Sequence, residues 1–455
     1  MPSTAIVWFR RDLRVHDHPP LATALREHDR VLPLFVVDPR LLGGRFASPA
    51  RAHFLRGSLE ELGASLEERG GGLVLRVGKP HTEVARLAGE TRADAVYCAA
   101  DVSPFARARD EKVRRALDVE LHELPGNFAI DLDALKPYRV FSPYHRAWLA
   151  AERRDLEPAP AAIEMPRMPS GRLPTLPGRL LENPVREPGE DAARQALADW
   201  LRNGIDDYSA THDNLSTDSS RLSPYLHFGC LSPREVEAKV AERRGDGPEE
   251  FRRQLAWRDF YGQLLLHHPD AAKRELQERY RSLEWDDDDE LLEAWRSGRT
   301  GYPLVDAGMR QLRASGFMHN RARLVVGSFL TKDLHLDWRH GEAHFMRHLL
   351  DGDEASNNGN WQWIASVGAD PAPYFRRILN PTTQQKRHDP DGDYVRRWVP
   401  ELRDVPPELL AEPWKMSDEE QRSASCVIGR DYPAPIVDHR EERERALALY
   451  RAASG

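Results

Sequence analysis

Four indole side chains lie among polar groups in the stretch from residue 295 to residue 363. The indole ring is among the side chains most easily oxidised by one electron, so indoles spaced around a cofactor pocket can pass electrons to the cofactor. A single tryptophan is usually a core residue, because its surface is large and mostly apolar. The combination of several indoles with amide, guanidinium and carboxylate groups is the feature that indicates redox chemistry. The indoles are Trp295, Trp338, Trp361 and Trp363, and the polar residues are Asn320, Arg321, Arg323, Asp351, Asp353 and Asn357.

Two other patterns look like metal sites but lack part of the ligand set. His340, His344 and His348 recur every four residues on one face of a helix, yet no cysteine or separate carboxylate pattern accompanies them. Residues 389–393 read Asp-Pro-Asp-Gly-Asp, but the glycine is fourth rather than sixth and Pro400 stands where a calcium loop needs glutamate. We therefore predict no metal site and expect the histidines to be solvated or to cap the helix.

The chain has 455 residues, a formal net charge of −8 and three cysteines without paired spacing. This length predicts two or three domains, and the cysteines argue against a disulfide framework. Neither a signal peptide nor a membrane-length apolar run is evident, so we expect a cytoplasmic protein without membrane contact. Because the charge is negative, nucleic-acid binding would need a local basic surface. Candidates for that surface are residues 321–323, 376–377, 386–388 and 396–397.

The first 125 residues alternate short apolar runs with helical stretches, which is typical of a doubly wound α/β domain around a parallel sheet. The first strand is followed by Arg10-Arg11-Asp12 instead of a glycine-rich turn, so a dinucleotide held there is not expected. The expected strands are Ala5–Phe9, Val31–Val37, Leu73–Val77 and Ala95–Cys98, and the expected helices are Pro19–Glu27, Ala50–Arg69, His81–Thr91 and Phe105–Leu117.

The rest of the chain divides into a connector and a helical region. Eight prolines between Pro158 and Pro188 argue against a helix or inner strand and predict a connector across the surface. After Asp191 the periodicity is almost entirely helical. The predicted fold class is therefore α/β plus all-α. The predicted boundaries are an α/β domain at 1–125, an interdomain linker at 126–190 and a helical domain at 191–455.

Four segments closely resemble, in order and spacing, the flavin domain of the photolyase/cryptochrome family. They read G-Y-P-L-V-D-A-G-M-R-Q-L at 301–312, M-H-N-R-A-R at 318–323, D-G-D at 351–353 and N-N-G-N-W-Q-W at 357–363. The resemblance covers essentially the whole chain and is strongest to the class I photolyases. It implies bound FAD and the repair of cyclobutane pyrimidine dimers in DNA by electron transfer from excited FADH⁻. In such chemistry the protein supplies position and electrostatics to the cofactor.

The resemblance also implies which residues hold the flavin. In residues 217–224, hydroxyls and backbone N–H groups at a helix start would bind the FAD pyrophosphate, although alone this segment also fits a serine N-cap cluster. Asn357 matches the residue opposite flavin N5, and Trp361, Trp338 and Trp295 match a relay that reduces the flavin from the surface inward. The implied cofactor-binding residues are Tyr208, Ser219, Ser220, Arg221, Leu222, Ser223, Phe251, Arg258, Arg323, Asp351, Gly352 and Asp353.

A dimer cannot be reached within stacked DNA, so the resemblance implies that the lesion is flipped into a pocket, as photolyases do. Trp257 and Trp363 match the two stacking walls. Asn320 stands where six-four photoproduct enzymes typically have a histidine, which favours the cyclobutane substrate. We expect UV-damaged DNA as the partner and a monomeric protein. The implied substrate contacts are Gln254, Trp257, Asn320, Arg321, Leu324 and Trp363.

Three positions depart from the family pattern. Gln254 replaces a pocket glutamate, Leu324 replaces a methionine, and His212 replaces an arginine. Glutamine can still donate a hydrogen bond to a pyrimidine carbonyl but cannot release a proton. Leucine conserves volume and loses the polarisable sulfur. These changes bear on repair efficiency more than on the fold.

The N-terminal domain resembles the family members that carry a light-harvesting antenna. Arg11, Phe35, Arg51 and Asp101 match the subgroup that binds 8-hydroxy-5-deazaflavin. The alternatives are methenyltetrahydrofolate or no antenna chromophore.

Two other functions stay open. A cryptochrome-type blue-light receptor would have the same fold, but Asn357 argues against it because plant cryptochromes carry aspartate there. The chain also closes on a helical stretch, Arg440–Ala452, without the long tail expected of a signalling cryptochrome. An electron-transfer flavoprotein that binds no DNA would not need Trp257, Trp363 or the local arginines.

Overall fold

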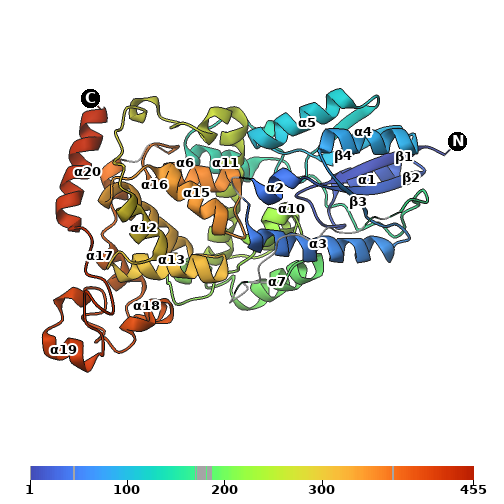
Figure 1. Ribbon diagram of the computed structural model, residues 1–455. Helices are drawn as coiled ribbons and strands as arrows, with labels where there is room; N and C mark the ends of the chain where they lie inside the picture. The colour runs from blue at the N-terminus through green and yellow to red at the C-terminus, as the bar shows by residue number, and fades with distance from the viewer. Residues whose placement is uncertain are drawn as a thin grey trace.

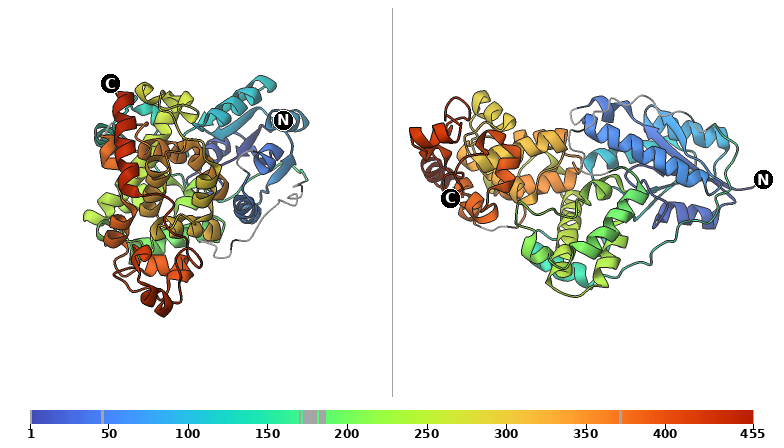
Figure 2. Two further views of the ribbon diagram at one scale, coloured as in Figure 1. Left: turned by 60° about the vertical axis from the view of Figure 1, so that its left-hand side comes forward. Right: turned by 90° about the horizontal axis from the view of Figure 1, so that it is seen from below.

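The computed structural model describes residues 2–44, 47–169, 171, 181, 187–370 and 373–454. An α/β part built from the N-terminal residues lies beside a larger helical part, and the C-terminal helix lies at the end of the molecule farthest from the sheet (Figure 1). The two further views show the same arrangement (Figure 2). The predicted fold class, α/β plus all-α, is confirmed.

A five-stranded, all-parallel sheet forms the centre of the α/β part, in the order β3-β2-β1-β4-β5. The strands are β1 Thr4–Phe9, β2 Arg30–Val37, β3 Val74–Val77, β4 Ala95–Ala99 and β5 Glu120–Leu124, and the helices are α1 Pro19–Glu27, α2 Pro39–Gly43, α3 Pro49–Glu67, α4 Pro80–Thr91 and α5 Pro104–Ala116. Val7 and Phe9 pack on the face covered by α1 and α3, whereas Ile6 and Trp8 pack on the face covered by α4 and α5. Because both faces are covered, the inner strands read as continuous apolar runs.

The edge strand β5 is missing from the sequence prediction. Its sequence, Glu-Leu-His-Glu-Leu, alternates polar and apolar residues, and Leu121 is its one buried side chain. An edge strand exposes part of its surface and is often charged, so it lacks the apolar run that marked the inner strands.

The helical part contains fourteen α-helices from α7 onward within the described residues, preceded by α6 Phe141–Ala150. They are α7 Glu190–Asn203, α8 Tyr208–Thr211, α9 Ser223–Phe228, α10 Pro233–Ala241, α11 Asp246–His267, α12 Asp289–Ser297, α13 Pro303–Ser315, α14 Asn320–Ser328, α15 Trp338–His348, α16 Glu354–Ile364, α17 Pro381–His388, α18 Asp393–Trp398, α19 Asp418–Ser423 and α20 His439–Ser454. A π-helical turn, Phe329–Asp333, follows α14. The 3-10 turns are Leu132–Ala134, Pro269–Ala272, Glu278–Tyr280, Tyr374–Arg377, Pro400–Leu402 and Pro413–Lys415.

Among its described residues, the segment predicted as a linker contains an α-helix that the proline count did not reveal. Helix α6 lies before the proline-rich stretch and packs against α11, with Tyr144 and Trp148 fully buried. Residues 151–169 contain no helix or strand, which agrees with the prediction for the part from Pro158 onward. This stretch lies against the α/β part, where the Ile163 N–H donates to the Arg69 carbonyl at 2.7 Å. Residues 170, 172–180 and 182–186 of the predicted connector lie outside the described residues.

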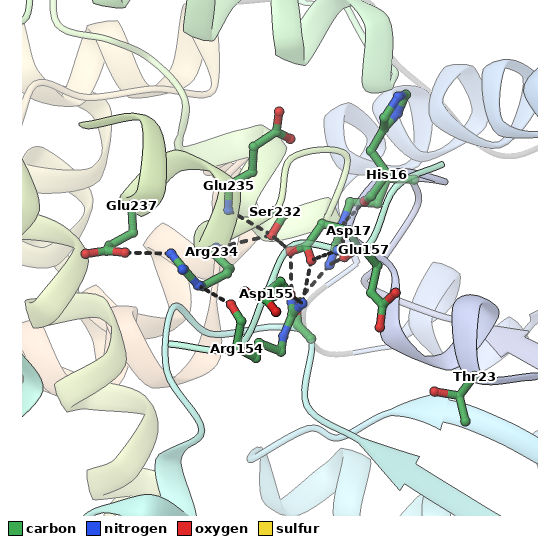
Figure 3. A network of polar contacts seen from close by, with 12 residues as sticks. His16, Asp17, Thr23, Arg154, Asp155, Glu157, Ser232, Arg234, Glu235 and Glu237 are labelled. Carbon is green, nitrogen blue, oxygen red and sulfur yellow. Dashed lines mark hydrogen bonds and ion pairs between the residues drawn. The ribbon is translucent and has the colours of Figure 1, made fainter. Parts of the chain in front are cut away.

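A buried carboxylate joins three segments of the chain (Figure 3). Asp17, in the loop after β1, accepts hydrogen bonds from the Arg154 guanidinium at 2.8 Å, the Glu157 N–H at 3.2 Å and the Ser232 hydroxyl. Ser232 also caps α10, where Arg234 donates to Glu237 at 2.8 Å. Burial opposes the charge of Asp17, but the hydrogen bond from Arg154 and nearby arginines lower its pKa. The loop after β1, the chain after α6 and the start of α10 are therefore tied together.

No helix among the described residues is long and apolar enough to cross a membrane.

Candidate functional site

The D-G-D segment between α15 and α16 brings three predicted site residues together. Asp351 accepts a hydrogen bond from the Ser223 hydroxyl at 2.6 Å and one from the Arg323 guanidinium at 2.9 Å. Ser223 begins α9 and Arg323 lies on α14, so the contact joins elements that are far apart in the sequence. The predicted grouping of these residues is present in the structure.

Asp353 connects this segment to the α/β part. It caps α16 by accepting from the Ser356 N–H at 2.8 Å and pairs with Arg11, which follows β1. Burial disfavours its charge, but Arg11 and Arg258 hold the pKa of Asp353 far below its usual range. Burial and then Arg11 lower the pKa of His227 well below its ordinary value. The site thus keeps an ionised carboxylate beside a neutral imidazole.

The amide of Asn357 is oriented by a neighbouring helix. Its Nδ2 donates to the Glu342 carbonyl on α15 at 3.0 Å, and Nδ2 of Asn358 donates to the Glu342 carboxylate at 3.0 Å. A carbonyl only accepts, so the nitrogen of Asn357 must face Glu342. Its oxygen is left to accept from an N–H group of a bound molecule.

The hydroxyl-rich segment lies at the start of α9 and beside a cavity. Leu222 is the residue before the helix, and its N–H donates to the Ser220 hydroxyl at 3.4 Å. Arg221 has a φ of 49°, and its guanidinium carbon lies 5.5 Å from the Phe317 ring centre. Ser219, Arg221 and Phe317 line a cavity of about 120 Å³. The wall is completed by Leu215, Ser216, Thr217, Asp218, Gln311, His319, Asp393, Tyr394, Arg397 and Trp398.

These donors fit the chemistry of a flavin dinucleotide. Nε of Arg221 and Nδ1 of His227 are buried and have no hydrogen-bond partner in the described part of the chain, which is a cost unless a ligand satisfies them. Tyr208 and Phe251, two further residues of the predicted flavin site, pack edge to face at 5.3 Å. Arg258 donates to the Asn127 carbonyl at 2.7 Å. Hydroxyl and guanidinium donors suit a diphosphate, and the carboxylates suit ribose hydroxyls.

The indoles are brought together, but not with the exposure that the relay prediction requires. Trp361 and Trp295 lie 6.1 Å apart between ring centres, and Nε1 of Trp338 donates to Glu275 at 3.2 Å. Trp295 is completely buried, so it cannot be the surface end of a relay, and that part of the prediction is wrong. Trp285 is half-buried and precedes Asp286, whose N–H donates to the His335 carbonyl at 2.9 Å, close in sequence to Trp338.

The histidine stripe on α15 is also less solvated than expected. His344 packs against Trp295 at 5.5 Å and against His348 at 4.5 Å. Burial and then the neighbouring His348 lower the pKa of His344 to about 3. His344 is therefore a neutral packing residue.

The two predicted lesion walls are each backed by another side chain. Trp257 on α11 stacks on Phe141 of α6 at 3.7 Å with an angle of 5° between the rings. Trp363 on α16 lies under the Arg377 guanidinium at 4.1 Å, and its Nε1 is buried without a partner among the described residues. Both indoles are half-buried. Each ring is thereby held from one side, which suits a stacking platform.

The polar residues near these walls have partners that the sequence did not reveal. Gln254 donates to Glu250 at 2.7 Å, and Nε of Arg321 donates to Asp213 at 3.2 Å. Asn320 is exposed at the start of α14, and Leu324 is partly buried against the helical core. A DNA phosphate that contacted Arg321 would therefore have to compete with Asp213.

Three of the four predicted antenna residues, Arg11, Arg51 and Asp101, lie where the α/β part meets the D-G-D segment. Arg11 lies 3.9 Å from Asp101, and Phe35 is buried in β2. Arg51 donates to the Leu349 carbonyl at 2.7 Å, and burial lowers its pKa to about 10. A Cβ on Gly352 would lie 2.8 Å from the Arg51 guanidinium, so a side chain at position 352 would displace that group. The predicted antenna and flavin residues thus adjoin each other.

One carboxylate in this region is absent from the sequence prediction. Burial, and then Asp101 and Asp353, raise the pKa of Glu354 to about 7. In the sequence, the position of Glu354 directly after the D-G-D motif was the one indication that it belongs to the site.

Comparisons with known proteins identify the class to which this fold and site belong. Residues 5–165 match the family model "DNA photolyase", and residues 251–452 match "FAD binding domain of DNA photolyase". The chain is 44% identical to a deoxyribodipyrimidine photo-lyase of Streptomyces griseus, covering 97% of this chain and 98% of the relative. It is 38% identical to one of Escherichia coli, covering 99% of both. The chain belongs to the DNA photolyase family.

Solved structures in the comparison include a photolyase and a cryptochrome. A class III photolyase from Agrobacterium tumefaciens has a TM-score of 0.93 at 35% identity, covering 100% of this chain and 98% of the other. A Synechocystis cryptochrome has a TM-score of 0.93 at 31% identity, covering 99% of both chains. The same fold therefore occurs in a protein described as a photolyase and in one described as a cryptochrome, so the fold alone does not decide between the two.

Proposed function

We propose that this protein repairs cyclobutane pyrimidine dimers in DNA under blue light. FAD, when bound and reduced, would supply the photoexcited electron donor. The observation that carries the proposal is the pair of backed indoles, Trp257 on Phe141 and Trp363 under Arg377. A receptor that binds no lesion has no need of two such platforms. Stacking of a base on an aromatic side chain is worth about 1–3 kcal/mol.

Each residue group has a proposed task. The hydroxyls of residues 219–223 and the Arg221 guanidinium would bind the diphosphate. Asp351 and Asp353 would bind the rest of the cofactor, and the oxygen of Asn357 would accept a hydrogen bond from it. We propose a relay of Trp361, Trp338 and the half-buried Trp285, with Trp295 as a buried neighbour of Trp361.

The finer assignments are proposals as well. We assign the protein to class I, although a class III enzyme shares the fold, because the resemblance of the site residues favours it. We propose 8-hydroxy-5-deazaflavin as the antenna at Arg11, Phe35, Arg51 and Asp101, with folate or no antenna as the alternatives. We also propose a monomer in the cytoplasm that meets DNA through local arginines. The domain boundaries 1–125, 126–190 and 191–455 are part of the same proposal.

Binding to damaged DNA tests the proposed function. Wild-type protein should bind a duplex that contains one thymine dimer more tightly than the same duplex without it. Trp257→Ala should weaken lesion binding by about 5- to 150-fold, the equivalent of one stacking contact. Trp414→Ala is the matched control, because Trp414 is also half-buried but packs on Tyr302. Equal affinity of wild-type protein for the two duplexes would favour the receptor.

A further inference from the structure

A carboxylate one helical turn away holds the amide of Gln254. Glu250 and Gln254 are four residues apart on α11, so they lie on one face of the helix. Nε2 of Gln254 donates to Oε1 of Glu250 at 2.7 Å. Both residues are half-buried, and the Glu250 side chain is 23% exposed. An ionised carboxylate only accepts hydrogen bonds, so the nitrogen of Gln254 must face Glu250.

The same helix face carries a lesion wall. Trp257 follows Gln254 by three residues and Glu250 by seven, a spacing that places all three side chains along one stripe of α11. Phe141 occupies one face of the Trp257 ring. The oxygen and the second N–H of Gln254 are therefore offered beside the indole on which a pyrimidine would stack.

Thymine and cytosine present different hydrogen-bond patterns to an amide that is held in one orientation. Thymine presents acceptor, donor, acceptor along O4, N3–H and O2, so an amide oxygen opposite N3–H always finds an acceptor for its N–H on either side. Cytosine presents donor, acceptor, acceptor along its amino group, N3 and O2, so it matches only one of the two amide orientations. Turning Gln254 over would place its oxygen against the Glu250 carboxylate, acceptor against acceptor.

We infer that Glu250 is a positioning residue: it holds the nitrogen of Gln254 and so leaves the oxygen to meet N3 of the pyrimidine, where thymine has an N–H donor and cytosine only an acceptor, which favours thymine over cytosine in the dimer. This inference rests on the proposed function, because it requires a pyrimidine dimer beside Trp257. Glutamine at position 250 could either donate or accept, so Glu250→Gln would allow Gln254 to turn over without a change in volume.

The test compares the repair of two dimers by protein that has been reduced beforehand. Single-turnover repair is measured on oligonucleotides with a thymine–thymine dimer and with a cytosine-containing dimer. Glu250→Gln should lower the thymine-to-cytosine rate ratio by about threefold to tenfold, the factor that one hydrogen bond provides. Glu249→Gln removes the same charge from an exposed neighbour and should leave the ratio unchanged.

A second variant separates this role from a general structural effect. Gln254→Met keeps the volume but removes the amide, so adding Glu250→Gln to it should change the ratio no further. An unchanged ratio in Glu250→Gln, or an effect that persists in the Gln254→Met background, would overturn the inference and leave the repair function standing. If wild-type protein repaired neither dimer, the inference and the proposed function would both fall.

Discussion

Different interactions hold the two sides of the proposed active site: ion pairs on the flavin side and stacked rings on the lesion side. On the flavin side, Asp351 pairs with Arg323, and Asp353 pairs with Arg11 from the α/β part. On the lesion side, Trp257 and Trp363 are backed by Phe141 and Arg377. Paired charges fix geometry permanently, which suits a resident cofactor. Supported rings with available polar atoms suit a substrate that must enter and leave.

Removing a charge on the flavin side should have the largest effect. Asp353→Ala leaves Arg11 and Arg258 without their shared carboxylate. Loss of one partner from a buried pair costs about 3–5 kcal/mol, and we expect about 3 kcal/mol because the Arg11 side chain is 30% exposed. Urea unfolding measures this change, and Asp391→Ala at an exposed position is the control. A loss as small as that of the control would refute the idea that these pairs hold the two parts together.

Glu354 should make the same region sensitive to pH. Its pKa of about 7 is raised in the folded protein, so folding favours the protonated form. As the pH rises from the ordinary glutamate pKa of about 4.3 to about 7, Glu354 is ionised in the unfolded chain but still protonated in the folded protein, so the free energy of unfolding falls. Above pH 7 Glu354 is ionised in both states, and the free energy of unfolding falls no further on its account. Glu354→Gln should therefore raise the free energy of unfolding by about 2 kcal/mol at pH 8 and leave it unchanged at pH 4. Thermal or urea unfolding at the two pH values measures this, with exposed Glu293→Gln as the control. Equal gains at both pH values would contradict the titration account.

Tryptophan-to-phenylalanine substitutions in the relay should affect photoreduction of the flavin without affecting repair on the lesion side. Trp361→Phe keeps an aromatic filler but removes the oxidisable indole, so photoreduction of oxidised flavin should collapse while repair by pre-reduced protein survives. Trp285→Phe should also slow photoreduction, because its half-buried ring would be the surface end of the relay. Trp295→Phe should have the smaller effect, because in the proposed relay the half-buried Trp285, and not the buried Trp295, is the surface end. Flavin absorbance under blue light records each rate, and a larger loss in Trp295→Phe would restore the original relay.

The smallest expected effect concerns the arginines on the lesion side. DNA affinity should fall with salt, and each phosphate contact contributes about one unit of log–log slope. Arg376 is exposed, and no ion pair with it occurs among the described residues, so Arg376→Ala should flatten the slope by about one unit. Arg321→Ala should flatten it less, because Arg321 already pairs with Asp213. A salt titration of binding decides the order, and a salt-independent affinity would refute phosphate contact altogether.

Sequence patterns predicted what depends on local periodicity and missed what depends on tertiary contact. The inner strands β1, β2 and β4 were readable because burial on both faces makes their sequences almost continuously apolar. The burial of Trp295 was missed, although its i,i+3 spacing from Leu292 on an amphipathic helix was a signal for it. The partners Asp213 for Arg321 and Asp353 for Arg11 are separated from them by 108 and 342 residues, so only the folded chain reveals them. Glu250 lies within one turn of Gln254, and the i,i+4 rule on a predicted helix was the missed signal.

Light-dependent repair tests the central claim most directly. Purified protein with reduced FAD is mixed with an oligonucleotide that contains one thymine dimer, and intact thymines are measured after blue light and after darkness. The account predicts restoration in the light, none in darkness, and loss of restoration in Trp257→Ala. Bound, reduced flavin with no restoration in the light would contradict repair and favour the receptor.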